Sequence, residues 1–98
     1  MERRKEPRFP FTCAVEGLPT AGRNPEGWSQ PVRGTLVDLG AGGACVIADW
    51  PVEPRSVLAW RFYVPSMPVP VPVLMHVRGV QPLLSKLGSF RIALAFIT

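Results

Sequence analysis

The sequence predicts an all-β protein whose strands close into a six-stranded antiparallel β-barrel or a closed sandwich. Apolar residues alternate with a period of two in several short stretches, which is typical of half-buried strands. Glycine, proline and polar residues separate these stretches, and none of them carries apolar residues at helical spacing over three turns. A chain of 98 residues suffices for one domain with one modest core.

The first strand is expected to begin at Phe9, with its apolar side chains on one face. These side chains are Phe9, Phe11, Cys13 and Val15. A loop rich in proline and glycine is expected from Gly17 to Gln30. The remaining strands are expected at Val32–Asp38, Ala44–Ala48, Val57–Val64, Val71–Val80 and Phe90–Phe96.

Prolines and tryptophans give two further expectations. Pro68, Pro70 and Pro72 cannot donate ladder hydrogen bonds, so the first half of the fifth strand is expected at an edge of the sheet. Trp60 belongs to the apolar face of the fourth strand and is expected in the core. Trp50 precedes a proline between two strands, where packing in a loop is expected.

Composition limits the classes of partner and the compartment. A formal net charge of +4 favours anionic partners such as nucleotides or phosphates. No apolar run is long enough to span a bilayer, and Phe9 to Val15 is too short and interrupted for the apolar region of a signal peptide. A cytoplasmic protein without membrane insertion is therefore expected. Cys13 and Cys45 lie in apolar stretches, which suits buried thiols in a reducing compartment. A disulfide between them is possible, but nothing in the sequence supports it.

Two short motifs carry the functional information. The stretch "RKEPR" places Arg4 and Arg8 before the first strand, and "DLGAGG" places Asp38, Gly40 and Gly43 between the second and third. In this order and spacing, the chain resembles the PilZ domains over its whole length. These domains are small six-stranded barrels with an R-x-x-x-R arm and a D/N-x-S-x-x-G turn. Gly40 stands where the family has serine.

The resemblance implies a specific organisation and ligand. Residues 1–8 would form a flexible arginine-bearing arm, and residues 9–98 a PilZ-type barrel. The ligand would be the bacterial second messenger cyclic di-GMP, held between the arm and the turn, and the arm would close over it. In the family, an arginine at the position of Arg3 accompanies the binding of two intercalated ligand molecules. The closing strand "FRIALAF" also resembles the family's ending, although Ala93 replaces a common glycine.

The chemistry of the motif residues agrees with this ligand. An arginine fork can bind guanine O6 and N7, clamp phosphate oxygens or stack on the base, whereas lysine offers a point charge. The carboxylate of Asp38 can accept hydrogen bonds from guanine N1 and N2, which adenine does not present. Glycines beside it allow the backbone to approach the ligand closely. Arg33 and Arg78 are candidates for further ligand contacts.

Four alternatives stand beside ligand binding. Asp38 could cap the glycine turn through its own backbone, and the arginine-rich start could be an ordinary solvated terminus. Without the family's serine, a hydrogen bond is lost that is worth roughly 0.5–1.5 kcal/mol, or about threefold to tenfold in affinity. A degenerate domain would act as a protein–protein interaction module, with the edge near residues 69–73 as its surface. A barrel binding single-stranded nucleic acid is disfavoured because most aromatic residues alternate inward.

No enzymatic machinery, cofactor or metal site is expected. No serine or cysteine has a suitable base nearby in the sequence, and neither a carboxylate pair nor a metal-binding cluster occurs. His76 is the single histidine and lies opposite the apolar face of its strand, which suits a surface or rim position. Signalling would therefore pass to a separate effector protein, which the sequence does not identify.

Overall fold

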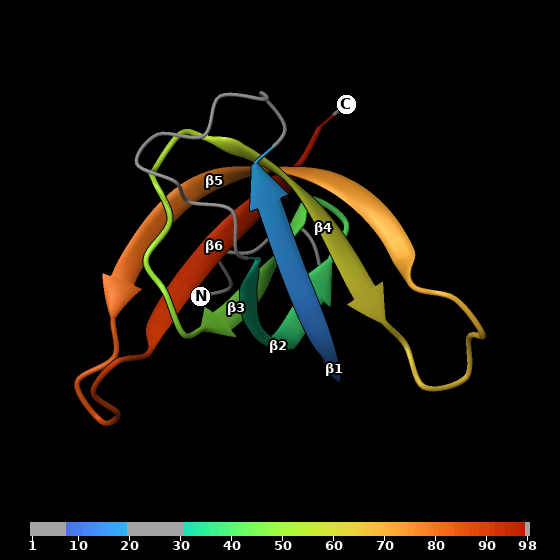
Figure 1. Cartoon of the computed structure of the whole chain (residues 1–98), viewed down its shortest axis with the longest axis horizontal. Coiled ribbons are helices and arrows are strands. Elements are labelled where there is room, and N and C mark those ends of the chain that lie inside the picture. The colour runs from blue at the N-terminus through green and yellow to red at the C-terminus, as the bar shows by residue number, and fades with distance from the viewer. Residues whose placement is uncertain (1–7, 20–30, 98) are drawn as a thin grey trace, which may run out of the picture.

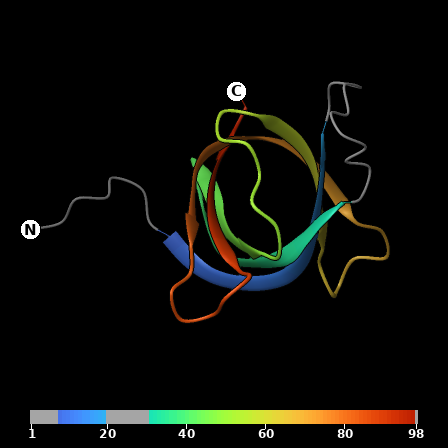
Figure 2. The same cartoon turned by 60° about the vertical axis from the view of Figure 1, so that its left-hand side comes forward.

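Six antiparallel strands form the protein in a computed structural model that describes residues 8–19 and 31–97 (Figure 1). The strands are β1 (Arg8–Pro19), β2 (Val32–Gly40), β3 (Gly43–Ala48), β4 (Val57–Tyr63), β5 (Val71–Pro82) and β6 (Phe90–Phe96). They close into a barrel in the order β1-β2-β3-β6-β5-β4, which appears as a ring when the molecule is turned (Figure 2). The prediction of a six-stranded antiparallel barrel is confirmed. No helix able to cross a membrane occurs in the described ranges.

The first strand is longer than the sequence indicated, because Gly17 is part of it. Gly17 pairs with Val32 of β2 and with Trp60 of β4. A side chain at this position would come within 2.9 Å of the Trp60 ring, so glycine lets the strand run past the indole. The expectation that the loop begins at Gly17 is wrong, since β1 continues through Pro19.

The core fills the barrel with side chains from all six strands. Trp60 lies at its centre, fully buried as predicted. The other large side chains with almost no exposure are Leu36, Leu58, Met75, Ile92, Val15, Val32, Val46 and Val77. Trp50 is 58% exposed in the connection after β3, so the expectation that it packs in a loop is wrong. Because Trp50 lies outside a strand, the alternation of apolar residues could not predict whether its side chain faces the core or the solvent.

A β-bulge breaks the alternation that the sequence shows in β1. Between Pro10 and Cys13 the register with β2 shifts, so that Phe11 and Thr12 lie opposite the single residue Val37. Phe11 is consequently 38% exposed, whereas Cys13 is buried. The placement of Phe11 on the core face is therefore wrong. A single extra residue moves the side chains on one side of the bulge to the opposite face of the sheet, and a period-two pattern does not reveal where this happens.

The proline-rich start of β5 forms an edge, as predicted. Residues Val71 to Leu74 pair with β4 only, and pairing with β6 begins at Met75. Pro72 lies opposite Arg61 in the β4 ladder without a register shift. This arrangement suits a proline whose nitrogen faces the side that has no partner strand within the described residues.

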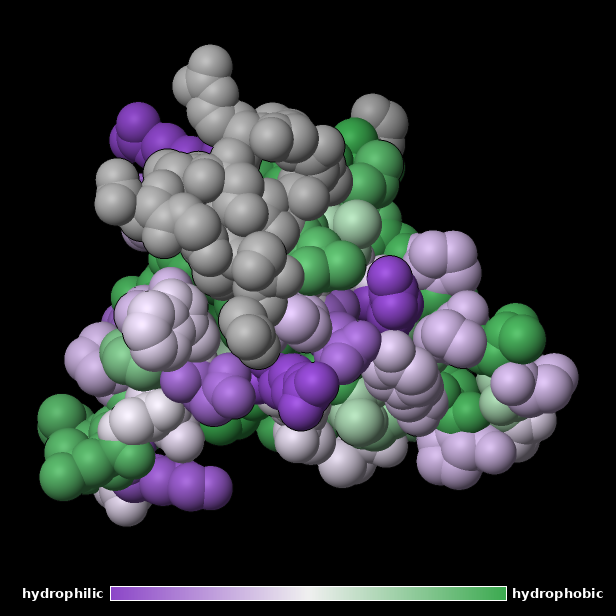
Figure 3. Space-filling view, viewed as in Figure 1, coloured by the Kyte–Doolittle hydropathy of each residue, from purple (hydrophilic) through white to green (hydrophobic). Residues whose placement is uncertain are grey.

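The connection between β5 and β6 projects from the barrel and carries apolar side chains. Leu84 and Leu87 are each 94% exposed. Gly88 has a φ of 84°, a conformation that glycine adopts without strain. The hydrophobic colour at the lower left of Figure 3 marks this projection, which lies in the same place in Figure 1.

Candidate functional site

The β-bulge at Val37 turns Asp38 to the outer face of the barrel. Leu36 is completely buried, and strict alternation would place Asp38 on the same inner side. The register between β2 and β3 shifts between these two residues, so that Asp38 pairs with Cys45 and Leu39 packs against the core. Asp38 is therefore only partly buried and lies on the outer side of its strand.

The register of β1 and β2 brings the two sequence motifs together. Arg8 is the first residue of β1, and its Cα partner is Gly40 of the glycine turn. Two residues further, Pro10 pairs with Asp38. The end of the R-x-x-x-R motif thus lies beside the D-x-G-x-x-G motif, on adjacent strands. Arg3 and Arg4, the other predicted arm residues, lie outside the described residues.

Gly43 has a structural role that the sequence did not reveal. It pairs with Ala95 of β6, and a Cβ atom built on it would overlap the carbonyl oxygen of Leu94. The same atom would lie 2.9 Å from the Leu94 carbonyl carbon and 3.0 Å from the Ala95 Cα. Glycine at this end of the motif therefore permits the close approach of β3 and β6.

A row of small residues extends from Asp38 across the outer face. In register order the row continues through Cys45 of β3 and Ala93 of β6 to Gly79 of β5. We call these three small residues the floor. Cys45 is buried without belonging to the core cluster, Ala93 is exposed, and a Cβ on Gly79 would meet no atom within 4 Å. Three small residues thus continue the row that begins at Asp38.

Arg91 lies at the floor, and the sequence analysis missed it. Its Nη1 donates a hydrogen bond to the Cys45 Sγ at 3.3 Å. The alternation of β6 indicated that Arg91 faces outward. Its place beside Cys45, the ladder partner of Asp38, depends on β3 lying between β2 and β6, which a sequence pattern does not specify.

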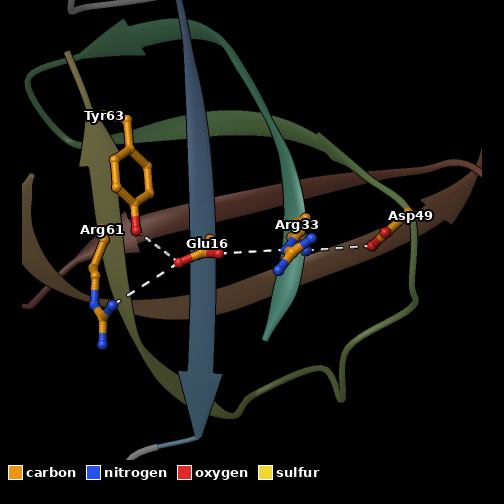
Figure 4. Close-up of polar contacts among 5 residues, drawn as sticks. All are labelled: Glu16, Arg33, Asp49, Arg61 and Tyr63. Atoms are coloured by element: carbon orange, nitrogen blue, oxygen red, sulfur yellow. Dashed lines mark hydrogen bonds and ion pairs between the residues drawn. The ribbon is translucent and has the colours of Figure 1, made fainter. Parts of the chain in front are cut away.

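Arg33 lies towards the other end of β2, in a separate polar network (Figure 4). Its Nε is 3.3 Å from the Glu16 Oε2, and its backbone nitrogen donates to the Asp49 Oδ1 at 3.3 Å. Glu16 Oε1 also accepts a hydrogen bond from the Tyr63 hydroxyl at 2.7 Å and lies 3.9 Å from Arg61 Nη1. The structure therefore does not bring Arg33 together with Asp38.

Arg78, the second candidate for an additional contact, lies at the far end of the floor. It is exposed at the register shift between Val77 and Gly79, next to the last residue of the floor. His76 is partly buried on the outer side of the same strand, between the buried Met75 and Val77. Within residues 8–19 and 31–97, no group of three or more potential metal ligands comes together.

The two cysteines are free thiols in different surroundings. Cys13 lies in the core, and burial raises the pKa of its thiol above the ordinary value of 9.0, an effect that a backbone hydrogen bond at Tyr63 partly opposes. Cys45 lies on the outer side, under the Arg91 guanidinium. The expectation of two buried thiols is confirmed.

Fold and site together define a small six-stranded barrel whose outer face presents a carboxylate, glycines and an arginine beside the floor. A family model for the PilZ domain matches residues 2–98. The chain therefore belongs to the PilZ family, whose members are receptors for cyclic di-GMP and ligand-binding or adaptor domains. A search of curated proteins finds no match.

Proposed function

We propose that this chain is a cyclic di-GMP receptor that binds the dinucleotide on the outer face of the barrel, between the arginine-bearing arm and the β2–β3 turn. The observation that carries the proposal is the β1–β2 register, which pairs Arg8 with Gly40 and sets Pro10 opposite the outward-facing Asp38. Two motifs separated by thirty residues of sequence become neighbours, on a face where the small residues Cys45 and Ala93 continue the row from Asp38.

Each residue has a defined task in this proposal. The Asp38 carboxylate accepts hydrogen bonds from N1 and N2 of one guanine. Arg8 supplies a fork for phosphate or for the Hoogsteen edge of guanine, and Arg4 does the same from the arm. Gly40 lets the backbone approach the ligand. Arg3 accompanies a second, intercalated ligand molecule.

The output of such a receptor is a contact with another protein. Arg8 itself belongs to β1, so the closing arm would be the segment that precedes it. Closure of that arm over the ligand would change the surface that the barrel presents to an effector. The proposal includes a cytoplasmic location, where the ligand and the effector would meet.

Calorimetric titration with cyclic di-GMP tests the proposal. The wild-type protein is expected to bind, and Arg8→Ala and Asp38→Ala are each expected to weaken binding by at least tenfold, since each removes a charged hydrogen-bonding group. Arg33→Ala is the matched control, because Arg33 is engaged by Glu16 away from the turn, and we expect its affinity to stay within about twofold of wild type. Cyclic di-AMP is the control ligand and is expected not to bind, since adenine lacks the N1–H and N2–H₂ donors that guanine presents to Asp38. Wild-type protein that gives no heat with cyclic di-GMP would refute the proposal.

A second candidate function is favoured by Leu84 and Leu87, whose almost complete exposure suits a protein contact. In this alternative the chain is an adaptor without a nucleotide ligand, consistent with the absence of the family's serine at Gly40. The same titration separates the two functions, because an adaptor of this kind gives no heat with cyclic di-GMP. Its interactions would depend on Leu84 and Leu87 and would not respond to the dinucleotide.

A further inference from the structure

Arg91 lies on the outer face of the barrel and belongs to neither sequence motif. In the strand ladders its partners are Ile47 of β3 and Gln81 of β5, one row away from the floor. The side chain leaves this row, because its Nη1 contacts the Cys45 Sγ at 3.3 Å. The guanidinium therefore lies against the floor rather than extending from its own row.

This position sets a cation and a carboxylate at the same small surface. Cys45 is the cross-strand partner of Asp38, and paired Cα atoms in an antiparallel ladder lie about 4.5–5.5 Å apart. A guanidinium in contact with Cys45 is consequently within roughly 10 Å of the Asp38 carboxylate. Between and beside them lie uncharged small side chains, including the exposed Ala93.

A carboxylate and a guanidinium on one surface suit the two ends of a guanine nucleotide. The base presents N–H donors that a carboxylate accepts, and the phosphate presents anionic oxygens that a guanidinium binds. The contact that Arg91 makes with Cys45 costs little to exchange, because a thiol sulfur is a weak hydrogen-bond acceptor. A phosphate oxygen would be a much stronger partner for the same Nη1.

Two exposed arginines, Arg33 of β2 and Arg61 of β4, lie instead beside an acidic side chain of β1. Arg33 and Arg61 both approach the Glu16 carboxylate, at 3.3 Å and 3.9 Å respectively. Arg91 is thus positioned for a ligand bound at Asp38 in a way that these two are not.

We propose that Arg91 is a further ligand-binding residue, which holds a phosphate group of cyclic di-GMP while Asp38 holds a guanine. This inference rests on the proposed receptor function and adds to it a contact from β6, outside both sequence motifs. Binding would then bridge β2 and β6 across β3 and connect the ligand to the strand that follows the exposed β5–β6 projection.

The test is a titration of cyclic di-GMP into wild type, Arg91→Ala, Arg91→Lys and Arg61→Ala. Arg91→Ala is expected to weaken binding by roughly 10-fold to 100-fold, because a charged hydrogen bond is lost. Arg91→Lys should bind more tightly than Arg91→Ala, since an ammonium still offers a phosphate a positive point charge although it lacks the guanidinium fork. Arg61→Ala removes an exposed arginine of the same outer surface and is expected to leave the affinity unchanged.

Salt dependence provides a readout that a purely structural role of Arg91 would not change. Binding by the wild type should weaken with rising ionic strength more steeply than binding by Arg91→Ala, since one phosphate contact is already missing in the variant. Circular dichroism and thermal melts verify folding, and Arg91→Gln replaces the alanine variant if the latter is unfolded.

The two failures are distinguishable. A wild-type protein that binds cyclic di-GMP with an affinity that Arg91→Ala and Arg91→Gln leave unaltered overturns the role of Arg91 and leaves the receptor function standing. A wild-type protein that does not bind overturns both. Loss of binding in Arg91→Ala with retention in Arg91→Lys supports the phosphate contact.

Discussion

Replacing Gly43 with alanine tests whether the last glycine of the D-x-G-x-x-G motif is required by the barrel itself. A Cβ at this position overlaps the Leu94 carbonyl oxygen and lies 2.9 Å from the carbonyl carbon. Carbon atoms pack comfortably at about 3.5–4.0 Å, so β6 would have to retreat by roughly 1 Å. Backbone atoms of a paired strand cannot swing aside as a flexible side chain can.

The size of the effect follows from the cheapest way to relieve this overlap. Separation of the end of the β3–β6 ladder, at the pair Gly43 and Ala95, gives up about two backbone hydrogen bonds of roughly 0.5–1.5 kcal/mol each. It also loosens the packing of the buried Ala44 beside it. Overpacking of this kind typically costs about 1–3 kcal/mol. We therefore expect Gly43→Ala to lower the free energy of unfolding by about 2–3 kcal/mol and Tm by roughly 10–20 °C.

Urea unfolding followed by circular dichroism measures the difference, with Gly79→Ala as the matched control. A Cβ on Gly79 meets no atom within 4 Å, and this strand glycine has no left-handed φ. Gly79→Ala should be neutral or stabilise by about 0.4–1 kcal/mol, because alanine restricts the unfolded chain. Equal stabilities of the two variants would refute the argument from close strand approach.

Three further predictions follow from the structure. Ala93→Trp fills the floor and is expected to weaken cyclic di-GMP binding at least tenfold. Ala14→Trp, on the exposed outer side of β1, should bind normally in the same titration. Equal binding by the two variants would contradict the proposed location of the ligand on the floor. Burial raises the pKa of Cys13, so above about pH 9 the thiol ionises first in the unfolded chain. The free energy of unfolding, measured in urea, should therefore fall more steeply with pH for wild type than for Cys13→Ala. Equal pH dependence of the two proteins would oppose this assignment. The double variant Leu84→Ser, Leu87→Ser should change the free energy of unfolding by less than about 0.5 kcal/mol, because both side chains are solvated in the folded protein. A larger decrease of this free energy, measured by urea unfolding, would show that the two leucines pack against the rest of the protein.

The sequence was sufficient to predict the strands and most of the core, because burial of one barrel face imposes a period of two. Trp60 and Ile92 are buried where alternation places them, and Phe90–Phe96 is a strand with the predicted bounds. Proline chemistry also predicted correctly that the start of β5 is paired on one side only. These features depend on neighbours along the chain, which the sequence displays.

The candidate site was only partly predictable, since its geometry depends on pairing between distant segments. The motifs identified Arg8 and Asp38, but the outward direction of Asp38 results from a bulge at Val37, one residue that the alternating pattern does not mark. Phe11 was misplaced for the same reason. Arg91 became a site residue only through the strand order, which no local pattern contains.

The half-paired start of β5 also affects how this barrel behaves at high concentration. An exposed strand edge can add strands from other chains and so begin aggregation. Here the edge carries Pro72, which cannot donate a hydrogen bond, and it is preceded by Pro70. Leu74, which is 51% exposed on the same segment, would otherwise make this edge attractive to a second molecule. The prolines that interrupt the apolar run are not needed to fill the core, and they hinder a second molecule from pairing with this edge.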